Sequence, residues 1–205
     1  MSAPTWPWTR WRERRRHRHG PHAALFAAHQ GSDWVALDLE TTGLDPRQDE
    51  IIALAAIPGE GNRLRLRERL DLVVRSDSPR IVDAIRHHRL RPADVAAGVP
   101  LDEALERLLA LIGNRPLVGY CIAFDIAMLD RALRARLGFG LPNRRIDVRA
   151  EFSHWLRQRQ PEEEPDLRFE AIAHRLGIPA YARHTALGDA LTAGLMHIRM
   201  TAHGR

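Results

Sequence analysis

Two carboxylates stand on alternate positions of one apolar run, and this feature constrains the fold more than any other. Residues 34–40 read WVALDLE, which predicts a buried strand. Alternate side chains of a strand share a face, so Asp38 and Glu40 are expected side by side. Their charges repel and are costly to desolvate, and a bound divalent cation removes both penalties. The pair alone predicts either a metal site or a Glu40 that caps the following turn.

Two further acids stand in apolar surroundings. Asp125 follows Phe124 at the start of a predicted helix, where an aspartate can also serve as an ordinary N-cap. Asp189 lies within an apolar helical segment, where an unpaired charge is costly. His184 precedes it by five residues and can accept a proton near neutral pH. A surface histidine and an exposed helical aspartate would give the same pattern.

Three segments in order are more specific than any one of them. Residues 38–46 read DLETTGLDP, residues 123–129 read AFDIAML, and residues 184–190 read HTALGDA. This set resembles the DEDD superfamily of 3′→5′ exonucleases, in the branch with a catalytic histidine. That branch includes the proofreading epsilon subunit of bacterial DNA polymerase III, ribonuclease T and oligoribonuclease. The resemblance covers about residues 34–200.

The resemblance implies an α/β fold of the ribonuclease H-like type, with a five-stranded mixed β-sheet flanked by α-helices. It also implies two divalent metal ions, Mg²⁺ or Mn²⁺. Asp38, Glu40 and Asp189 would hold one ion, and Asp38 would bridge to the second, with Asp125 near it. His184 would take the proton of the attacking water. The implied reaction is 3′→5′ release of nucleoside monophosphates from DNA or RNA.

Substrate contacts are implied in the same way. Thr41 and Thr42 would lie against the 3′-terminal nucleotide, and Leu44 would wedge beside its base. His88 resembles a histidine near the substrate cleft, although an ordinary loop histidine is an equal alternative. Many relatives have His-Asn where this chain has Tyr120-Cys121 after a glycine, which leaves the contacts near that strand open.

The chain divides into a basic extension and one domain. Residues 1–32 are rich in Trp and Arg, which predicts a disordered segment or a loosely docked helix. Its tryptophans either stack on nucleic-acid bases or pack on the domain surface. Residues 33–205 form the expected exonuclease domain. Strands are expected at 34–40, 50–57, 62–74, 116–119 and 145–148, and helices at 101–112, 123–137, 167–176 and 184–201, with one ending at Trp155 and one short helix between 75 and 100.

Composition bounds the partners. The formal net charge of +5 and a pI near 10.7 favour polyanions, here the 3′ ends of single-stranded DNA or RNA. A polymerase or another replication or repair protein is a further expected partner. The single cysteine, Cys121, excludes a disulfide within the chain and suits the cytoplasm, and no apolar stretch reaches the roughly 20 residues that span a bilayer. The alternative function is a nucleic-acid-binding or polymerase-docking subunit with little turnover.

Overall fold

The computed structural model describes residues 16–17, 19–81, 90–179 and 181–202. Its centre is a mixed sheet in the order β3-β2-β1-β5-β6, with β4 also paired to β2. The strands are β1 (Asp33–Thr41), β2 (Ile51–Glu60), β3 (Arg63–Leu64), β4 (Leu70–Val73), β5 (Leu117–Gly119) and β6 (Arg145–Asp147). β1 and β2 pair antiparallel, whereas β1, β5 and β6 run parallel.

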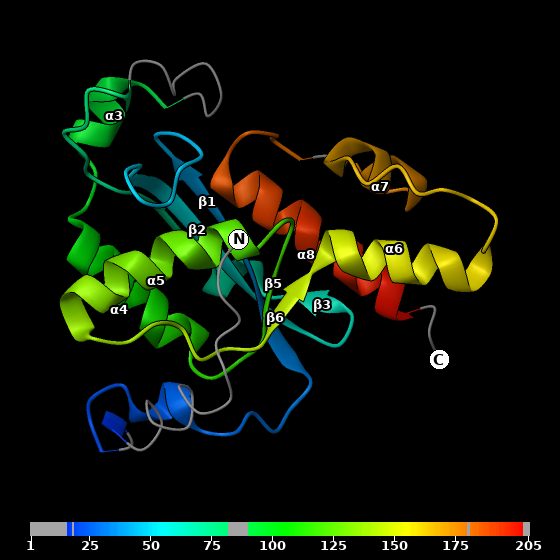
Figure 1. Cartoon of the computed structure of the whole chain (residues 1–205), viewed down its shortest axis with the longest axis horizontal. Coiled ribbons are helices and arrows are strands. Elements are labelled where there is room, and N and C mark those ends of the chain that lie inside the picture. The colour runs from blue at the N-terminus through cyan, green and yellow to red at the C-terminus, as the bar shows by residue number, and fades with distance from the viewer. Residues whose placement is uncertain (1–15, 18, 82–89, 180, 203–205) are drawn as a thin grey trace.

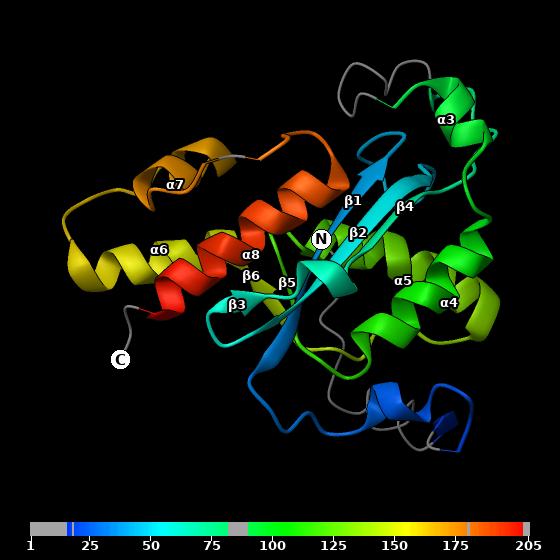
Figure 2. The same cartoon turned by 180° about the vertical axis from the view of Figure 1, so that it is seen from behind.

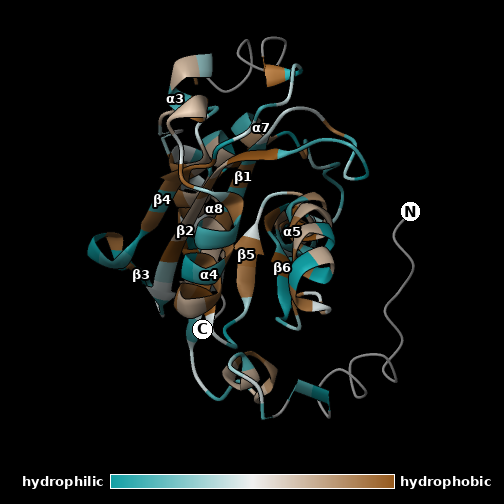
Figure 3. Cartoon of the chain, turned by 90° about the vertical axis from the view of Figure 1, so that its left-hand side faces the viewer, coloured by the Kyte–Doolittle hydropathy of each residue, from teal (hydrophilic) through white to brown (hydrophobic). Residues whose placement is uncertain are grey.

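Helices cover both faces of the sheet. They are α3 (Pro92–Ala96), α4 (Leu101–Ile112), α5 (Ala123–Leu137), α6 (Val148–Arg159), α7 (Phe169–Arg175) and α8 (Ala186–Ala202). Figures 1 and 2 show α4 and α5 on one side and α6, α7 and α8 on the other. In Figure 3, β5 is brown (hydrophobic) except at its glycine end, as suits a strand covered on both faces. This mixed sheet flanked by helices confirms the expected ribonuclease H-like architecture.

The side chains of β1 alternate between two hydrophobic cores, one on each face of the sheet. Val35, Leu37 and Leu39 pack into the core beneath α4 and α5. Trp34 and Ala36 pack into the second core, beneath α6, α7 and α8. Side chains of a strand alternate between faces, so Asp38 and Glu40 continue the face that α8 covers. The register of β1 therefore decides which helix meets the acidic pair.

The expected third strand is two short strands. β3 and β4 both pair with β2 and are separated by the 3-10 turn η2 (Leu66–Glu68). The carbonyl of Pro58 accepts a hydrogen bond from the backbone N–H of Arg65 at 2.8 Å. Proline has no N–H to donate back to Arg65, so the hydrogen bonding between strands is interrupted there. It resumes where Leu70 of β4 faces Ala56 of β2.

The end expected at residue 57 for the second strand is wrong, because β2 continues through Pro58 and Gly59 to Glu60. Gly59 faces Trp34 in the register, and a methyl group at Gly59 would overlap the indole ring. The glycine thus serves close packing within a strand rather than a turn. The strand was expected to end before Pro58 and Gly59 because proline and glycine usually mark the end of a strand.

The core begins before residue 33. A 3-10 turn, η1 (Ala23–Phe26), places Leu25 and Phe26 in the core with α4 and α5. The ring centroid of Phe26 lies 5.4 Å from that of Phe139, in an edge-on contact. The last part of the expected extension thus contains a short segment, residues 23–26, that packs on the domain. Within the described ranges, no helix combines the length and apolar character needed to cross a bilayer.

Candidate active site

Three carboxylates meet where β1 ends beside the first turn of α8. Ligand oxygens of Asp38, Glu40 and Asp189 all lie within 4.8 Å of one another. The sheet contributes the first two, and α8, which packs across β1 and β2, contributes the third. Figures 1 and 2 show the start of α8 beside the end of β1. The fold brings together acids that are about 150 residues apart in the sequence.

Asp125 lies near this cluster, but its carboxylate is hydrogen-bonded to the backbone of β1. Its Oδ1 accepts a hydrogen bond from the N–H of Leu39 at 3.0 Å. The N–H of Val35 points to β5, so by alternation that of Leu39 points to the same side. β5 ends at Gly119, which leaves no strand partner at that level. The Asp125 carboxylate takes the partner's place and fixes the segment between Asp38 and Glu40.

The electrostatics of the cluster favour a cation. Burial, followed by repulsion from neighbouring acids, raises the pKa of Asp38 well above its usual value. Burial and then Asp189 raise the pKa of Glu40 to about 7, and burial raises that of Asp125 to about 8. Asp189 is 9% exposed, and its buried Oδ1 has no hydrogen-bond partner within the described part of the chain. Hard oxygen ligands crowded in this way fit a divalent metal ion.

His184 stands two residues before α8 rather than at its first residue, which corrects the expected start of that helix. Its φ of 62° is left-handed, so the residue cannot belong to the helix. Thr185 caps the helix instead, because its Oγ1 accepts the N–H of Gly188 at 3.1 Å. The His184 side chain is exposed and lies in the loop between α7 and α8.

The turn between β1 and β2 carries the expected substrate residues. Leu44 is 87% exposed, which is unusual for a leucine. Thr42 is buried, and its hydroxyl donates to Asp49 Oδ1 at 3.1 Å and accepts from the N–H of Glu50. The hydroxyl of Thr41 donates to the carbonyl of Gly43 at 2.7 Å. Both hydroxyls thus shape the turn, and Leu44 is its free apolar group.

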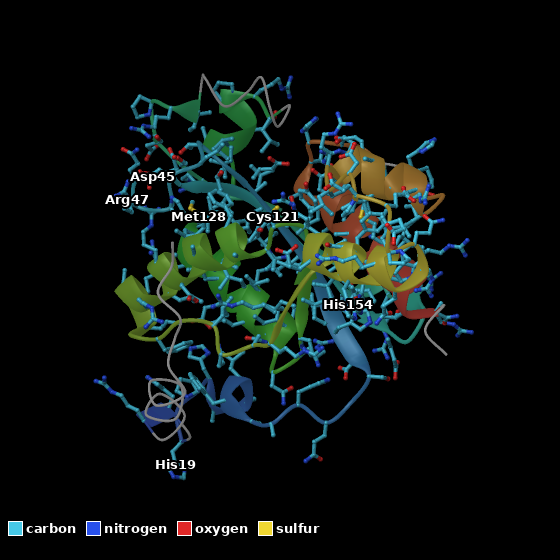
Figure 4. All side chains as sticks on the ribbon, turned by 45° about the vertical axis from the view of Figure 1, so that its right-hand side comes forward. His19, Asp45, Arg47, Cys121, Met128 and His154 are labelled. Carbon is cyan, nitrogen blue, oxygen red and sulfur yellow. The ribbon has the colours of Figure 1, made fainter. Side chains whose placement is uncertain are left out.

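Asp49 organises this turn, a role that the sequence did not reveal. It is 2% exposed, and its carboxylate also accepts the N–H of Asp45 at 2.8 Å and the guanidinium of Arg80 at 3.0 Å. These hydrogen bonds hold its pKa below the usual value although burial opposes them. Figure 4 shows Asp45 beside Arg47 at the outer edge of the turn, where they form an ion pair. His88 lies outside the described residues.

Arg183 was also missed. It donates to Asp189, a member of the acidic cluster, and to Glu170. One arginine among 31 gives no signal by itself. Its place directly before His184 was the only hint that the sequence offered.

Comparison with known proteins identifies the family. Residues 35–195 match the exonuclease family RNase_T. This chain belongs to that family. All three segments that carry Asp38, Asp125 and Asp189 lie within the matched range, so the family is shown over the whole candidate site.

Curated relatives of this RNase_T-family chain include proteins of the DNA polymerase III epsilon-like and PolC types. A DNA polymerase III subunit epsilon-like protein of Rhodobacter capsulatus is 29% identical over 82% of this chain and 23% of its own length. A PolC-type DNA polymerase III of Thermotoga petrophila is 23% identical over 83% of this chain and 12% of its own length. The chain thus spans about a quarter or less of these relatives.

Solved structures of exonuclease I share the fold. The zinc-bound complex of the Escherichia coli enzyme with single-stranded DNA has a TM-score of 0.70 and 21% identity, over 85% of this chain and 41% of its own. Exonuclease I of Methylocaldum szegediense has a TM-score of 0.69 and 23% identity, over 83% of this chain and 40% of its own. At such identity the likeness establishes the fold alone. The family match, rather than this likeness, identifies the chain as a member of the exonuclease family.

Proposed function

We propose that this chain is a metal-dependent exonuclease that removes nucleoside 5′-monophosphates from 3′ ends of DNA or RNA. The observation that carries the proposal is the convergence of Asp38, Glu40 and Asp189 within 4.8 Å, inside the range that matches the exonuclease family. An unpaired buried oxygen on Asp189 and the raised pKa values of Asp38 and Glu40 support a cation there. We propose two ions, Mg²⁺ or Mn²⁺, with Asp125 beside the second.

Each acid has a distinct part in this scheme. Asp38, Glu40 and Asp189 would hold the first ion, and their crowding gives that ion a favourable field. Asp125 would keep the end of β1 in place through its bond to Leu39. When bound, the ions supply Lewis-acid activation of a water and neutralise the charge that develops on the phosphate.

His184 would act as general base. An imidazole nitrogen takes one proton from the attacking water as the water oxygen bonds to the terminal phosphorus. The bond from phosphorus to the 3′ oxygen of the preceding nucleotide breaks, and that oxygen takes a proton from solvent. The products are a nucleoside 5′-monophosphate and a strand with a new 3′ hydroxyl. The exposed position of His184 leaves its ring free to reach a bound substrate.

The turn after β1 would hold the terminal nucleotide. Leu44 presents an apolar surface that suits a base, and the backbone at Thr41 and Thr42 lies directly after Glu40. The net charge of +5 favours a polyanionic strand. The complex of Escherichia coli exonuclease I with single-stranded DNA supports a single-stranded substrate for this chain.

A degradation assay tests the proposal. The full chain would be incubated with 5′-labelled single-stranded DNA and matching RNA, in Mg²⁺, in Mn²⁺ and in EDTA. We expect a ladder that shortens from the 3′ end, is lost in EDTA, and is lost in Asp38→Asn. Glu164→Gln, which removes a charge from the exposed loop between α6 and α7, is the matched control and should retain activity. Folded protein that degrades neither strand in either metal would reject the proposal.

A second candidate is a polymerase-associated exonuclease domain. The curated relatives favour it, because one is a DNA polymerase III subunit epsilon-like protein and another is a PolC-type DNA polymerase III. Under this candidate the domain would work on the primer end held by a polymerase, in the cytoplasm. Co-purification of the tagged full chain with a replicative polymerase from its own cells would support it, and recovery of the chain alone would count against it.

A further inference from the structure

The Arg183 side chain lies between two carboxylates and one aromatic ring. Its Nη1 donates to Asp189 Oδ2, while its Nε and Nη2 donate to Glu170 Oε1 at 2.9 and 2.7 Å. The guanidinium carbon lies 4.0 Å from the ring centroid of Phe169. Only 20% of the side chain is exposed. Arg183 is therefore a built-in cation, fixed to α7 on one side and to the acidic cluster on the other.

This cation neutralises the cluster. It pairs with Asp189, and its charge lowers the pKa of both Asp38 and Glu40 against the effect of burial. Its ion pair with Asp189 places a positive charge directly on the three-carboxylate group. Without it, three partly buried carboxylates would face one another with no counter-charge, which is unfavourable.

The backbone around Arg183 is held in an unfavourable conformation. Ala182 and His184, its two neighbours, have φ values of 40° and 62°. Left-handed conformations of residues with a Cβ cost free energy and persist only where other contacts enforce them. Here the hydroxyl of Thr185 donates to the carbonyl of Ala182 at 2.7 Å, and Arg183 supplies the ion pairs at either side.

We infer that Arg183 is a tethered counter-cation that occupies the Asp189 carboxylate until a divalent ion replaces it. The inference rests on the metal dependence proposed above. Two positive charges at one carboxylate would repel each other, so the ion and the guanidinium compete for the Asp189 carboxylate. Glu170 and Phe169 hold the displaced guanidinium close by. Arg183 is thus a positioning residue that weakens metal binding while it keeps the cluster folded.

Metal binding and thermal stability test this without any measurement of activity. The full chain, freed of metal with EDTA, would be titrated with Mn²⁺ by calorimetry, and its Tm measured in EDTA and in saturating Mn²⁺. Arg183→Gln should bind Mn²⁺ at least about fivefold more tightly, the factor that corresponds to ~1 kcal/mol. Its Tm should fall below that of the wild type in EDTA, and the gap should narrow in Mn²⁺.

Two further variants control the experiment. Arg168→Gln removes the same charge from an exposed position that pairs with Asp166, so its Mn²⁺ affinity should equal that of the wild type. Arg183→Lys keeps the charge but cannot span Asp189 and Glu170 with a planar fork, so its affinity should lie between those of the wild type and Arg183→Gln. It also provides the measurement if Arg183→Gln does not fold.

The outcomes separate this inference from the proposed function. If the wild type binds Mn²⁺ and the affinity of both Arg183 variants is unchanged or weaker, competition is refuted and the metal site stands. If the folded wild type binds no Mn²⁺, the metal dependence is refuted, and the inference with it. Tighter binding by Arg183→Gln, with Arg168→Gln unchanged, supports both.

Discussion

The hydrogen bond from Leu39 to Asp125 permits a test that separates the structural role of Asp125 from its proposed catalytic role. Asp125 is 5% exposed and accepts the N–H of Leu39, which lies between Asp38 and Glu40. Asp125→Ala would leave that buried donor without a partner. Asp125→Asn would keep an oxygen of the same shape at the same place. Both variants remove the carboxylate that the proposed mechanism needs.

The expected loss of Tm is larger for Asp125→Ala than for Asp125→Asn. A buried donor left unpaired costs about 1–3 kcal/mol. For a domain of this size, a loss of ~2 kcal/mol lowers the Tm by roughly 4–8 °C. The pKa of Asp125, raised to about 8 by burial, means that the acid is mostly protonated at pH 7 without metal. An asparagine resembles that neutral acid, so Asp125→Asn should remain within about 2 °C of the wild type.

The sign of the pH dependence follows from the same pKa. The folded value of about 8 exceeds the ordinary value of 3.8, so between these values the folded state holds a proton that the unfolded state lacks. The stability from this group is complete below about pH 4 and is lost as the pH rises toward 8. In EDTA, the stability of the wild type relative to Asp125→Asn should therefore decrease from pH 5 to pH 8.

The assay pairs thermal unfolding in EDTA with the exonuclease ladder in Mn²⁺. We expect both variants to lose activity and only Asp125→Ala to lose several degrees of Tm. Equal Tm values for the two variants at pH 7 would show that the hydrogen bond to Leu39 contributes little. Full activity of Asp125→Asn would remove Asp125 from the mechanism.

Three further predictions follow from neighbouring positions. Asp38→Asn, which removes one of the repelling charges, should raise the Tm in EDTA at pH 8 and still abolish the ladder; an unchanged or lower Tm would contradict the repulsion. Gly188→Ala should lower both Tm and activity, because the added methyl group would overlap the carbonyl oxygens of Tyr181 and Ala182; wild-type values for both would contradict this. Leu44→Ala, at an 87% exposed position, should shift the Tm by no more than about 2 °C and raise the KM for oligonucleotides, whereas an unchanged KM would argue against base contact.

The local sequence pattern was sufficient to predict most of the helices and strands. The helices expected at 101–112 and 123–137 have those bounds, because amphipathic spacing and Gly113 and Gly138 mark them. The strand with the acidic pair was equally clear, since apolar residues surround it. The predicted bounds were wrong where a residue type that usually ends an element lies inside one. Gly59 continues a strand because Trp34 packs on it, and the helix expected to end at Trp155 continues to Arg159.

The candidate site divides in the same way. The sequence determined which acids are present and that Asp38 and Glu40 share a face, because covalent order and strand alternation are local properties. That Asp189 joins them was expected only from the family resemblance, and the tertiary structure brings the three together. Only the tertiary structure decided that Asp125 bonds to Leu39 because β5 ends early, and that Arg183 enters the cluster. These contacts join residues far apart in sequence or fix one side chain among many similar ones. They depend on how helices pack on the sheet, which no local pattern specifies.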